Sequence, residues 1–219
     1  MTRTTAEDAS LLEAVAAQRR ELAALLGALA PQAWDHPTLC AGWRVRDVVA
    51  HVTMPFRYPA GRFLAEMIKA RGNFDRMADR CARRDGQAPP GELLAMLRQN
   101  ERNPWKPPGG GLAAALTHDV IHGQDITVAL DLEHLVPEER LRIVLHTITT
   151  PKSLKHFGLD LTGIELRATD IDWSFGSGAP LSGPAQDLAL ALCGRKLPAA
   201  RLQGAPAARF TASQPLNRP

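Results

Sequence analysis

The strongest constraint on the fold is a pair of histidines, His118 and His122, in an apolar segment that predicts a helix over residues 112–130. Residues four apart lie on the same face of a helix, about one turn from each other. Burying two imidazoles in apolar surroundings costs free energy unless partners satisfy their nitrogen atoms. The fold must therefore bring polar groups or a metal ion to this face.

A third histidine, His51, belongs to a segment that predicts another helix, beginning near Trp43 or Arg44. On a facing helix, His51 would complete a set of three imidazole ligands with His118 and His122. A catalytic zinc site has three protein ligands and one open position. The alternative is that the three histidines are hydrogen-bonded structural residues, since pairs at this spacing also arise by chance.

Two aspartates are spaced to support these histidines. Asp47 precedes His51 by four residues and Asp125 follows His122 by three, so each carboxylate lies on the side of its helix that carries the histidine. There it would accept the second ring N–H and fix the tautomer. The alternative for both aspartates is a helix cap or a surface acid.

Helical periodicity dominates the first two thirds of the chain. We predict helices over residues 5–30, 43–55, 63–82, 90–99 and 112–130, and one that begins at Pro137. Pro55 is expected to kink or stop the second of these helices, because its ring clashes with the carbonyl four residues earlier.

The pattern changes near Pro151. Residues 164–170 alternate apolar and polar and predict a strand, with 172–176 as its hairpin partner and a short helix at 185–193. We therefore expect a mainly α fold with a small α+β C-terminal part. The expected domains are a helical one over 1–150 and a smaller one over 151–219 that ends in a frayed tail.

The composition excludes several function classes. The net charge of the 219 residues is +3, and no basic run is interleaved with aromatics, so nucleic acid is not an expected partner. No apolar stretch approaches the roughly 18 residues of a membrane span, so no membrane partner is expected. The three cysteines, Cys40, Cys81 and Cys193, form no CxxC pair, which favours a reducing cytoplasm. No GxSxG element supports serine hydrolysis.

Two further features allow a chemical and a structural interpretation. Cys40 lies near a helix N-terminus, which lowers a thiol pKa, but a small buried residue is the favoured interpretation. Trp34 and Trp43 are interpreted as core anchors rather than as platforms for a ligand.

The segment from Leu39 to His51, LCAGWRVRDVVAH, resembles the opening signature of the actinobacterial mycothiol-dependent maleylpyruvate isomerase family. Residues 118–125 (HDVIHGQD) resemble its second motif. Segments of the last third, LRATDIDWS, LSGPA and the Gly194–Arg195 pair, resemble its small C-terminal domain, so the resemblance covers most of the chain.

The resemblance implies a DinB-like four-helix bundle followed by a small sterol-carrier-like region. It also implies a metal site at His51, His118 and His122. Characterised members have a glutamate where this chain has His118, whereas triads of histidines are common in the wider DinB-like superfamily. Whether isomerase activity is retained stays open at this point.

The implied activity is S-transfer to, or cis/trans isomerisation of, a small electrophile, with mycothiol as the cosubstrate. A divalent metal would favour the thiolate, which is the nucleophilic form. We expect zinc first and nickel second, although three imidazoles also suit copper or iron. Arg195 is the candidate residue for binding a substrate carboxylate. The chain is expected to be a monomer or a homodimer.

Two other functions stay open. The first is a non-catalytic protein that binds a small molecule or a lipid, in which a metal would be structural or absent. The second is a metal-activated hydrolase, because an open zinc position also activates water. In that case Asp125 or Asp119 would have to act as the general base.

Overall fold

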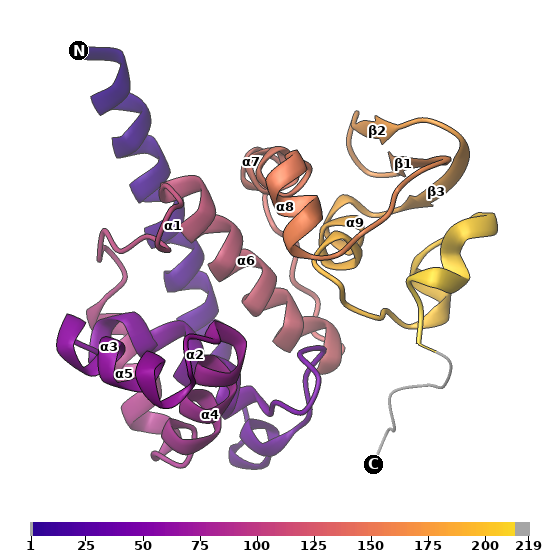
Figure 1. Ribbon diagram of the computed structural model, residues 1–219. Coiled ribbons are helices and arrows are strands. Elements are labelled where there is room, and N and C mark those ends of the chain that lie inside the picture. Colours follow the sequence, from indigo (N-terminus) through magenta and orange to yellow (C-terminus); the bar gives the residue numbers. More distant parts are fainter. Residues whose placement is uncertain (1, 213–219) are drawn as a thin grey trace. The chain divides into compact units, whose positions relative to one another are not determined.

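A computed structural model describes residues 2–212 of the chain, and its helices and strands form two compact units, Met1–Ile126 and Thr127–Pro219 (Figure 1). The first unit is helical. Its elements are α1 (Thr2–Gly27), η1 (Pro31–Asp35), α2 (Val45–Arg57), α3 (Ala60–Lys69), α4 (Phe74–Asp85), α5 (Pro90–Gln99) and α6 (Leu112–Ala129), whose last residues belong to the second unit.

The second unit combines helices with a small sheet. Its elements are α7 (Glu138–Ile148), α8 (Pro151–His156), β1 (Ile164–Ala168), β2 (Ser174–Gly176), β3 (Ala179–Gly183), α9 (Ala185–Leu192), η2 (Ala199–Arg201) and η3 (Ala205–Arg209). The expectation of a mainly α fold with a small α+β part is therefore confirmed. Residues 213–219, most of the expected frayed tail, lie outside the described residues.

The two units divide near the end of α6, earlier than the change of sequence pattern near Pro151. The reason is that α7 packs against α9 within the second unit. The domain limits of 1–150 and 151–219 stay a prediction.

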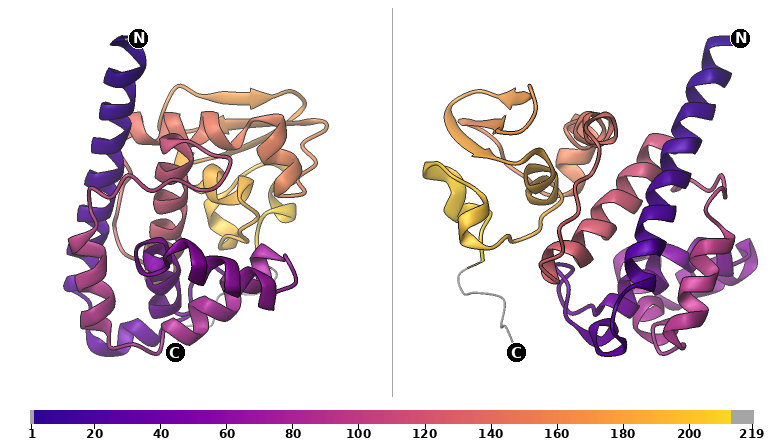
Figure 2. Two further views of the ribbon diagram at one scale, coloured as in Figure 1. Left: turned by 60° about the vertical axis from the view of Figure 1, so that its left-hand side comes forward. Right: turned by 180° about the vertical axis from the view of Figure 1, so that it is seen from behind.

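Helices α1 and α6 run side by side in the first unit (Figures 1 and 2). The face of α1 that is buried recurs at helical spacing and comprises Val15, Ala16, Leu22, Ala23 and Leu26. Each fully buried valine or leucine contributes about 1.5–3 kcal/mol relative to an exposed one. The amphipathic pattern of α1 thus produces an apolar face that packs on α5, and Leu22 on it approaches Gly123 of α6.

Helix α2 packs on α4 and α5 through its valines, all of which are buried: Val45, Val48, Val49 and Val52. Its N-terminus is capped by Asp47, whose carboxylate accepts a hydrogen bond of 2.9 Å from the backbone N–H of Arg44. A negative charge in the first turn also suits the helix dipole.

Pro55 does not stop α2, which continues to Arg57. Proline has no N–H to donate to the carbonyl four residues earlier. Side chains donate to neighbouring carbonyls of the same helix. Arg57 Nη2 donates to the Ala50 carbonyl at 2.6 Å, and Thr53 Oγ1 donates to the Val49 carbonyl at 2.8 Å. Helix α2 therefore passes through the proline and ends two residues later.

The helix expected over 63–82 is two helices, α3 and α4, separated at Arg71 and Gly72. Both residues have left-handed backbones, with φ of 56° and 75°. The Gly72 N–H donates to the Met67 carbonyl and the Arg71 N–H to the Ile68 carbonyl, which is the bonding pattern of a Schellman cap. The cap places arginine at the left-handed position where glycine is usual. The local sequence therefore did not reveal that the predicted helix is divided at this point.

The sheet of the second unit has the strand order β2-β1-β3. The predicted hairpin is present, with Leu166 opposite Phe175 in antiparallel β1 and β2. The parallel pairing of β1 with β3, in which Leu166 lies opposite Leu181, was not predicted. Helix α9 covers these strands with Leu188, which is fully buried together with Leu166 and Leu181.

Candidate metal centre

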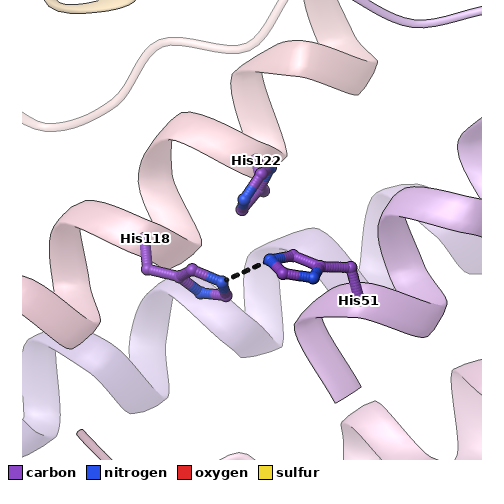
Figure 3. Close-up of side chains that lie close together, drawn as sticks. All are labelled: His51, His118 and His122. Atoms are coloured by element: carbon purple, nitrogen blue, oxygen red, sulfur yellow. Dashed lines mark hydrogen bonds between the residues drawn. The ribbon is translucent and has the colours of Figure 1, made fainter. Parts of the chain in front are cut away.

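The three histidines singled out in the sequence meet inside the first unit. His51 extends from α2, and His118 and His122 extend from successive turns of α6 (Figure 3). Their ligand nitrogens all lie within 4.8 Å of one another, and the Nε2 atoms of His51 and His118 are 3.1 Å apart. Two nitrogens that share a tetrahedral zinc ion at 2.0–2.1 Å lie about 3.3 Å apart. The His51–His118 spacing is close to this value, and His122 would have to approach the other two nitrogens to complete such a site.

Carboxylates hold the outer nitrogens of both α6 histidines. His118 Nδ1 lies 3.0 Å from Asp119 Oδ1, and His122 Nδ1 lies 3.0 Å from Asp125 Oδ2. An ionised carboxylate only accepts hydrogen bonds, so Nδ1 would be the protonated nitrogen of each ring wherever its carboxylate is ionised. In a neutral imidazole, Nε2 then presents its lone pair, which is the form that ligates a metal.

Asp119 is an outer partner that sequence reasoning considered only as a general base. It is 1% exposed, and its Oδ2 accepts a hydrogen bond of 2.7 Å from Arg19 Nε on α1. Burial raises the pKa of Asp119, but the hydrogen bond from His118 and the charge of Arg19 outweigh burial and lower it. Asp119 is therefore ionised at neutral pH. Arg19 stands 100 residues earlier, and no local pattern linked the two.

Asp125 lies where its spacing predicted, beside His122. Asp47 makes the contact of a helix cap, because its Oδ2 accepts from the Arg44 backbone N–H at 2.9 Å, and its two oxygens also accept from the Arg44 guanidinium at 3.0 Å each. Arg195 belongs to the second unit, where its Nη1 donates to the Cys193 carbonyl at 2.8 Å after α9. The roles of Asp47 and Arg195 at the metal centre stay predictions.

Two tryptophans border the histidines. The Trp43 ring centroid lies 4.9 Å from that of His51 and 6.2 Å from that of His122. The Trp105 ring meets His118 edge-on at 5.6 Å. Trp43 is buried, as expected of a core anchor, but it also lines the centre. Trp105 was missed, since a loop tryptophan carries no periodic signal.

The loop before α2 brings Trp43 to α6. Thr38 closes it by donating from its backbone N–H and its hydroxyl to the Trp43 carbonyl, at 2.9 Å each. Gly42 permits the turn with a φ of 77°. The Leu39 N–H then donates to the Asp125 carbonyl at 3.1 Å, which ties the loop to the helix that bears two of the histidines.

The cysteines take no part in this donor set. Within the described residues, none of the three forms a disulfide, and the histidine group contains no thiol. Cys81 and Cys193 are buried, and Cys40 is half-buried in the loop before α2. Residues 2–212 contain no helix with the length and apolar character needed to cross a bilayer.

Comparison with known proteins agrees with the motif resemblance. Residues 15–103 match the family described as the mycothiol maleylpyruvate isomerase N-terminal domain. The match covers the N-terminal part of the chain and gives that part the likeness to this domain. The predicted family is therefore confirmed. The matched residues include His51 but end before the histidine-bearing α6.

Solved structures extend the likeness to the C-terminal unit. The crystal structure of the mycothiol-dependent maleylpyruvate isomerase, and that of a mutant with one histidine replaced by alanine, each align with a TM-score of 0.57 at 14% identity. Each alignment covers 91% of this chain and 93% of the other. At this identity, the likeness shows a shared fold. No curated protein matches the chain.

Proposed function

We propose that this protein is a metal-dependent enzyme that uses a low-molecular-weight thiol, mycothiol, in S-transfer to or cis/trans isomerisation of a small electrophile. The observation that carries the proposal is the convergence of three imidazoles, two of them oriented by carboxylates, inside a family named for this thiol. Zinc is our first choice of metal and nickel our second, and the donor set also suits copper or iron.

A divalent cation in this centre would supply a Lewis acid that favours the thiolate form of a bound thiol. The chain's own residues prepare for that chemistry. His51, His118 and His122 would hold the cation, and three protein ligands leave one position open. Asp119 and Asp125 keep the protons on the Nδ1 atoms, and the rings of Trp43 and Trp105 exclude water from the flanks.

The reaction balances without an oxidant or reductant. The thiolate adds to an activated cis double bond, so a C–S bond forms and a single bond is left free to rotate. Elimination restores the double bond in the trans form and returns the thiol. In S-transfer, the adduct is protonated and released. Arg195 is proposed to bind a carboxylate of the substrate, and the replacement of glutamate by His118 makes the centre less negative.

The proposal also includes assignments of the helical bundle, the C-terminal region, the oligomeric state and the domain limits. We take α1, α2, α5 and α6 as the DinB-like four-helix bundle, since α5 packs on both α1 and α2. The three strands with α9 would form the sterol-carrier-like region. We propose a cytoplasmic monomer or homodimer with domains over 1–150 and 151–219.

The hydrolase alternative lacks a suitable base. Asp119 and Asp125 are 1% and 0% exposed, and each carboxylate lies behind a histidine. A general base must reach the water that it deprotonates.

A lipid-binding function is also disfavoured. A pocket of about 300 Å³ in the second unit is lined by the polar side chains of Thr169, Asp187, Arg201 and Gln203 together with Gly183, Pro184 and Ala200. Such a lining suits a polar ligand better than an apolar one.

The first experiment measures metal content by plasma mass spectrometry after purification without chelator or nickel resin. Wild type and the His156→Ala control should contain about one metal ion per chain, and His51→Ala should contain almost none. Metal-loaded protein is then incubated with mycothiol and a panel of electrophiles that includes maleylpyruvate.

Each outcome separates one function from another. If wild type contains no metal and takes up neither zinc nor nickel, the three histidines are structural residues and the metal-dependent function is overturned. Bound metal without thiol consumption across the panel would overturn the thiol chemistry, and ester and amide substrates would then test hydrolysis.

A further inference from the structure

Arg19 is a fully buried arginine on α1, a helix that contributes no histidine to the centre. Its Nε donates to Asp119 at 2.7 Å. Its Nη1 lies within hydrogen-bonding distance of three carbonyls in the turn after α5, those of Asn100, Glu101 and Asn103, at 2.8–3.3 Å. A guanidinium is buried only where such partners compensate for lost hydration. Arg19 therefore places a buried positive charge beside the carboxylate of Asp119.

The carboxylate of Asp119 is divided between two partners. Oδ2 accepts from Arg19, and Oδ1 faces His118 Nδ1. Because Arg19 fixes one oxygen, the carboxylate cannot rotate without breaking a buried ion pair. The second oxygen is thereby aimed at the imidazole.

Arg19 also holds the turn that precedes Trp105. The Asn103 carbonyl accepts from Arg19 at 2.8 Å, and Asn103 Oδ1 accepts from the Trp105 backbone N–H at 3.0 Å. The Trp105 ring then meets His118 edge-on. Arg19 also lies over the Phe56 ring at 4.9 Å, on the helix that bears His51.

We propose that Arg19 is a positioning residue of the metal centre, acting through Asp119 to hold the ring of His118 with Nδ1 protonated and Nε2 bare. The inference rests on the proposed metal function and extends it to α1. Substitution of outer partners of metal ligands typically lowers metal affinity by about 10–100-fold. Arg19 is one contact further out, so we expect its loss to weaken Zn²⁺ and Co²⁺ binding by about 10-fold.

The test is a double-mutant cycle of Arg19→Met and Asp119→Asn, with Arg20→Met as the matched control. Arg20 is the next residue, but its side chain is 51% exposed. Affinity is measured by competition with a chromophoric chelator, and ligand geometry by the visible absorption of the Co²⁺ form. Arg19→Met should weaken binding and alter the spectrum, Arg20→Met should do neither, and the double variant should bind no more weakly than Asp119→Asn alone.

Additive effects in the cycle, or wild-type affinity in Arg19→Met, would overturn the proposal. Thermal melts of the metal-free proteins monitor folding, and if Arg19→Met fails to fold, Arg19→Lys replaces it with the same expectation of non-additivity. Long-range ¹⁵N–¹H spectra of metal-free protein read the tautomer of His118 directly. Wild type should show a single Nδ1–H form, and the Arg19 variant a mixture.

The metal-binding measurement and the tautomer spectra together separate the proposed function from the positioning role. A wild type that binds no metal would refute the proposed function, whereas an unchanged tautomer in the Arg19 variant would refute the positioning role.

Discussion

Two polar clusters share helix α2, and they differ in how their donors and acceptors are paired. The histidine cluster uses His51, in the middle of α2. The second, which we call the arginine cluster, uses Arg57 and Tyr58 at the end of α2 with Glu66, Arg80, Arg84 and Asp85. In the arginine cluster donors face acceptors, whereas in the histidine cluster nitrogen atoms of the same kind face one another.

Glu66 shows how complete the pairing is in the arginine cluster. Although it is 4% exposed, its carboxylate accepts from Arg84 at 3.0 Å, Lys69 at 3.3 Å and Arg80 at 2.5 Å. Burial raises the pKa of Glu66, but these three donors outweigh burial and lower it to about 2.

Asp85 is paired in the same way. It accepts from Arg57 at 2.7 Å and from the Tyr58 hydroxyl at 2.6 Å. Burial raises the pKa of Tyr58, and the hydrogen bond to Asp85 raises it further. The two carboxylates of the arginine cluster are thus satisfied by side-chain donors and need no ligand. In the histidine cluster, the Nε2 atoms of His51 and His118 face each other across a hydrogen bond of 3.1 Å, and three imidazole nitrogens lie close enough to be shared by one cation. The comparison therefore separates a structural cluster from a candidate site.

The largest expected effect tests the need for a cation. In zinc at about 1,000 times its Kd, wild type should gain about 4 kcal/mol of stability, because zinc binds the folded state alone. His51→Ala should lose that gain, and His156→Ala, in an exposed position of the second unit, should keep it. Thermal melts with and without zinc measure the difference. If zinc stabilised His51→Ala as much as wild type, the histidine cluster would not be the zinc site, and the contrast with the arginine cluster would be wrong.

The next effect concerns the packing of α4 against the start of the shared helix. A Cβ at Gly86 would lie 2.2 Å from Asp47 Oδ1 and 2.9 Å from the Ala82 carbonyl. We expect Gly86→Ala to destabilise the protein by about 2–3 kcal/mol through overpacking. Gly91→Ala is the control, since nothing lies within 4 Å of its added Cβ. Urea unfolding compares the two, and equal stabilities would contradict the close approach.

A smaller effect should follow from opening the arginine cluster. Glu66→Gln loses charge-assisted hydrogen bonds and should cost about 1–2 kcal/mol, because the freed arginines can still reach water. Zinc affinity should not change. Urea unfolding and a zinc titration of the same variant test both statements, and a weakened zinc site would show that the clusters are not independent.

The last expected effect is a dependence of stability on pH. The folded-state pKa of Glu66 is lowered to about 2 from an ordinary value of 4.5, so its stabilisation is present above pH 4.5 and is lost as the pH falls towards 2. Wild type should therefore lose stability relative to Glu66→Gln across this window. Urea unfolding of both proteins at several pH values measures the difference, and parallel curves would exclude the contribution of Glu66.

Local pattern determined most of the helices and the candidate ligands. The helix predicted over 112–130 is α6, Leu112–Ala129, and that predicted over 90–99 matches α5. The i, i+4 spacing placed His118 and His122 on one face, and the i, i+3 spacing placed Asp125 beside His122, because helical geometry alone sets these relations. The family motif likewise lies within one short segment.

Only the tertiary structure decided which distant groups meet. His51 reaches His118 across 67 residues, a meeting that the family resemblance implied but periodicity alone did not show, and Arg19 reaches Asp119 across 100, which nothing in the sequence indicated. The parallel strand β3 and the Arg71 cap also escaped sequence reasoning, because strand partners are chosen across the chain and an arginine rarely adopts a left-handed backbone. Periodicity specifies which face of a helix is buried, but the partner on that face is selected by the packing of the whole unit. The sequence thus determined the ligands that α6 presents, and the packing of α1 and α2 decided what surrounds them.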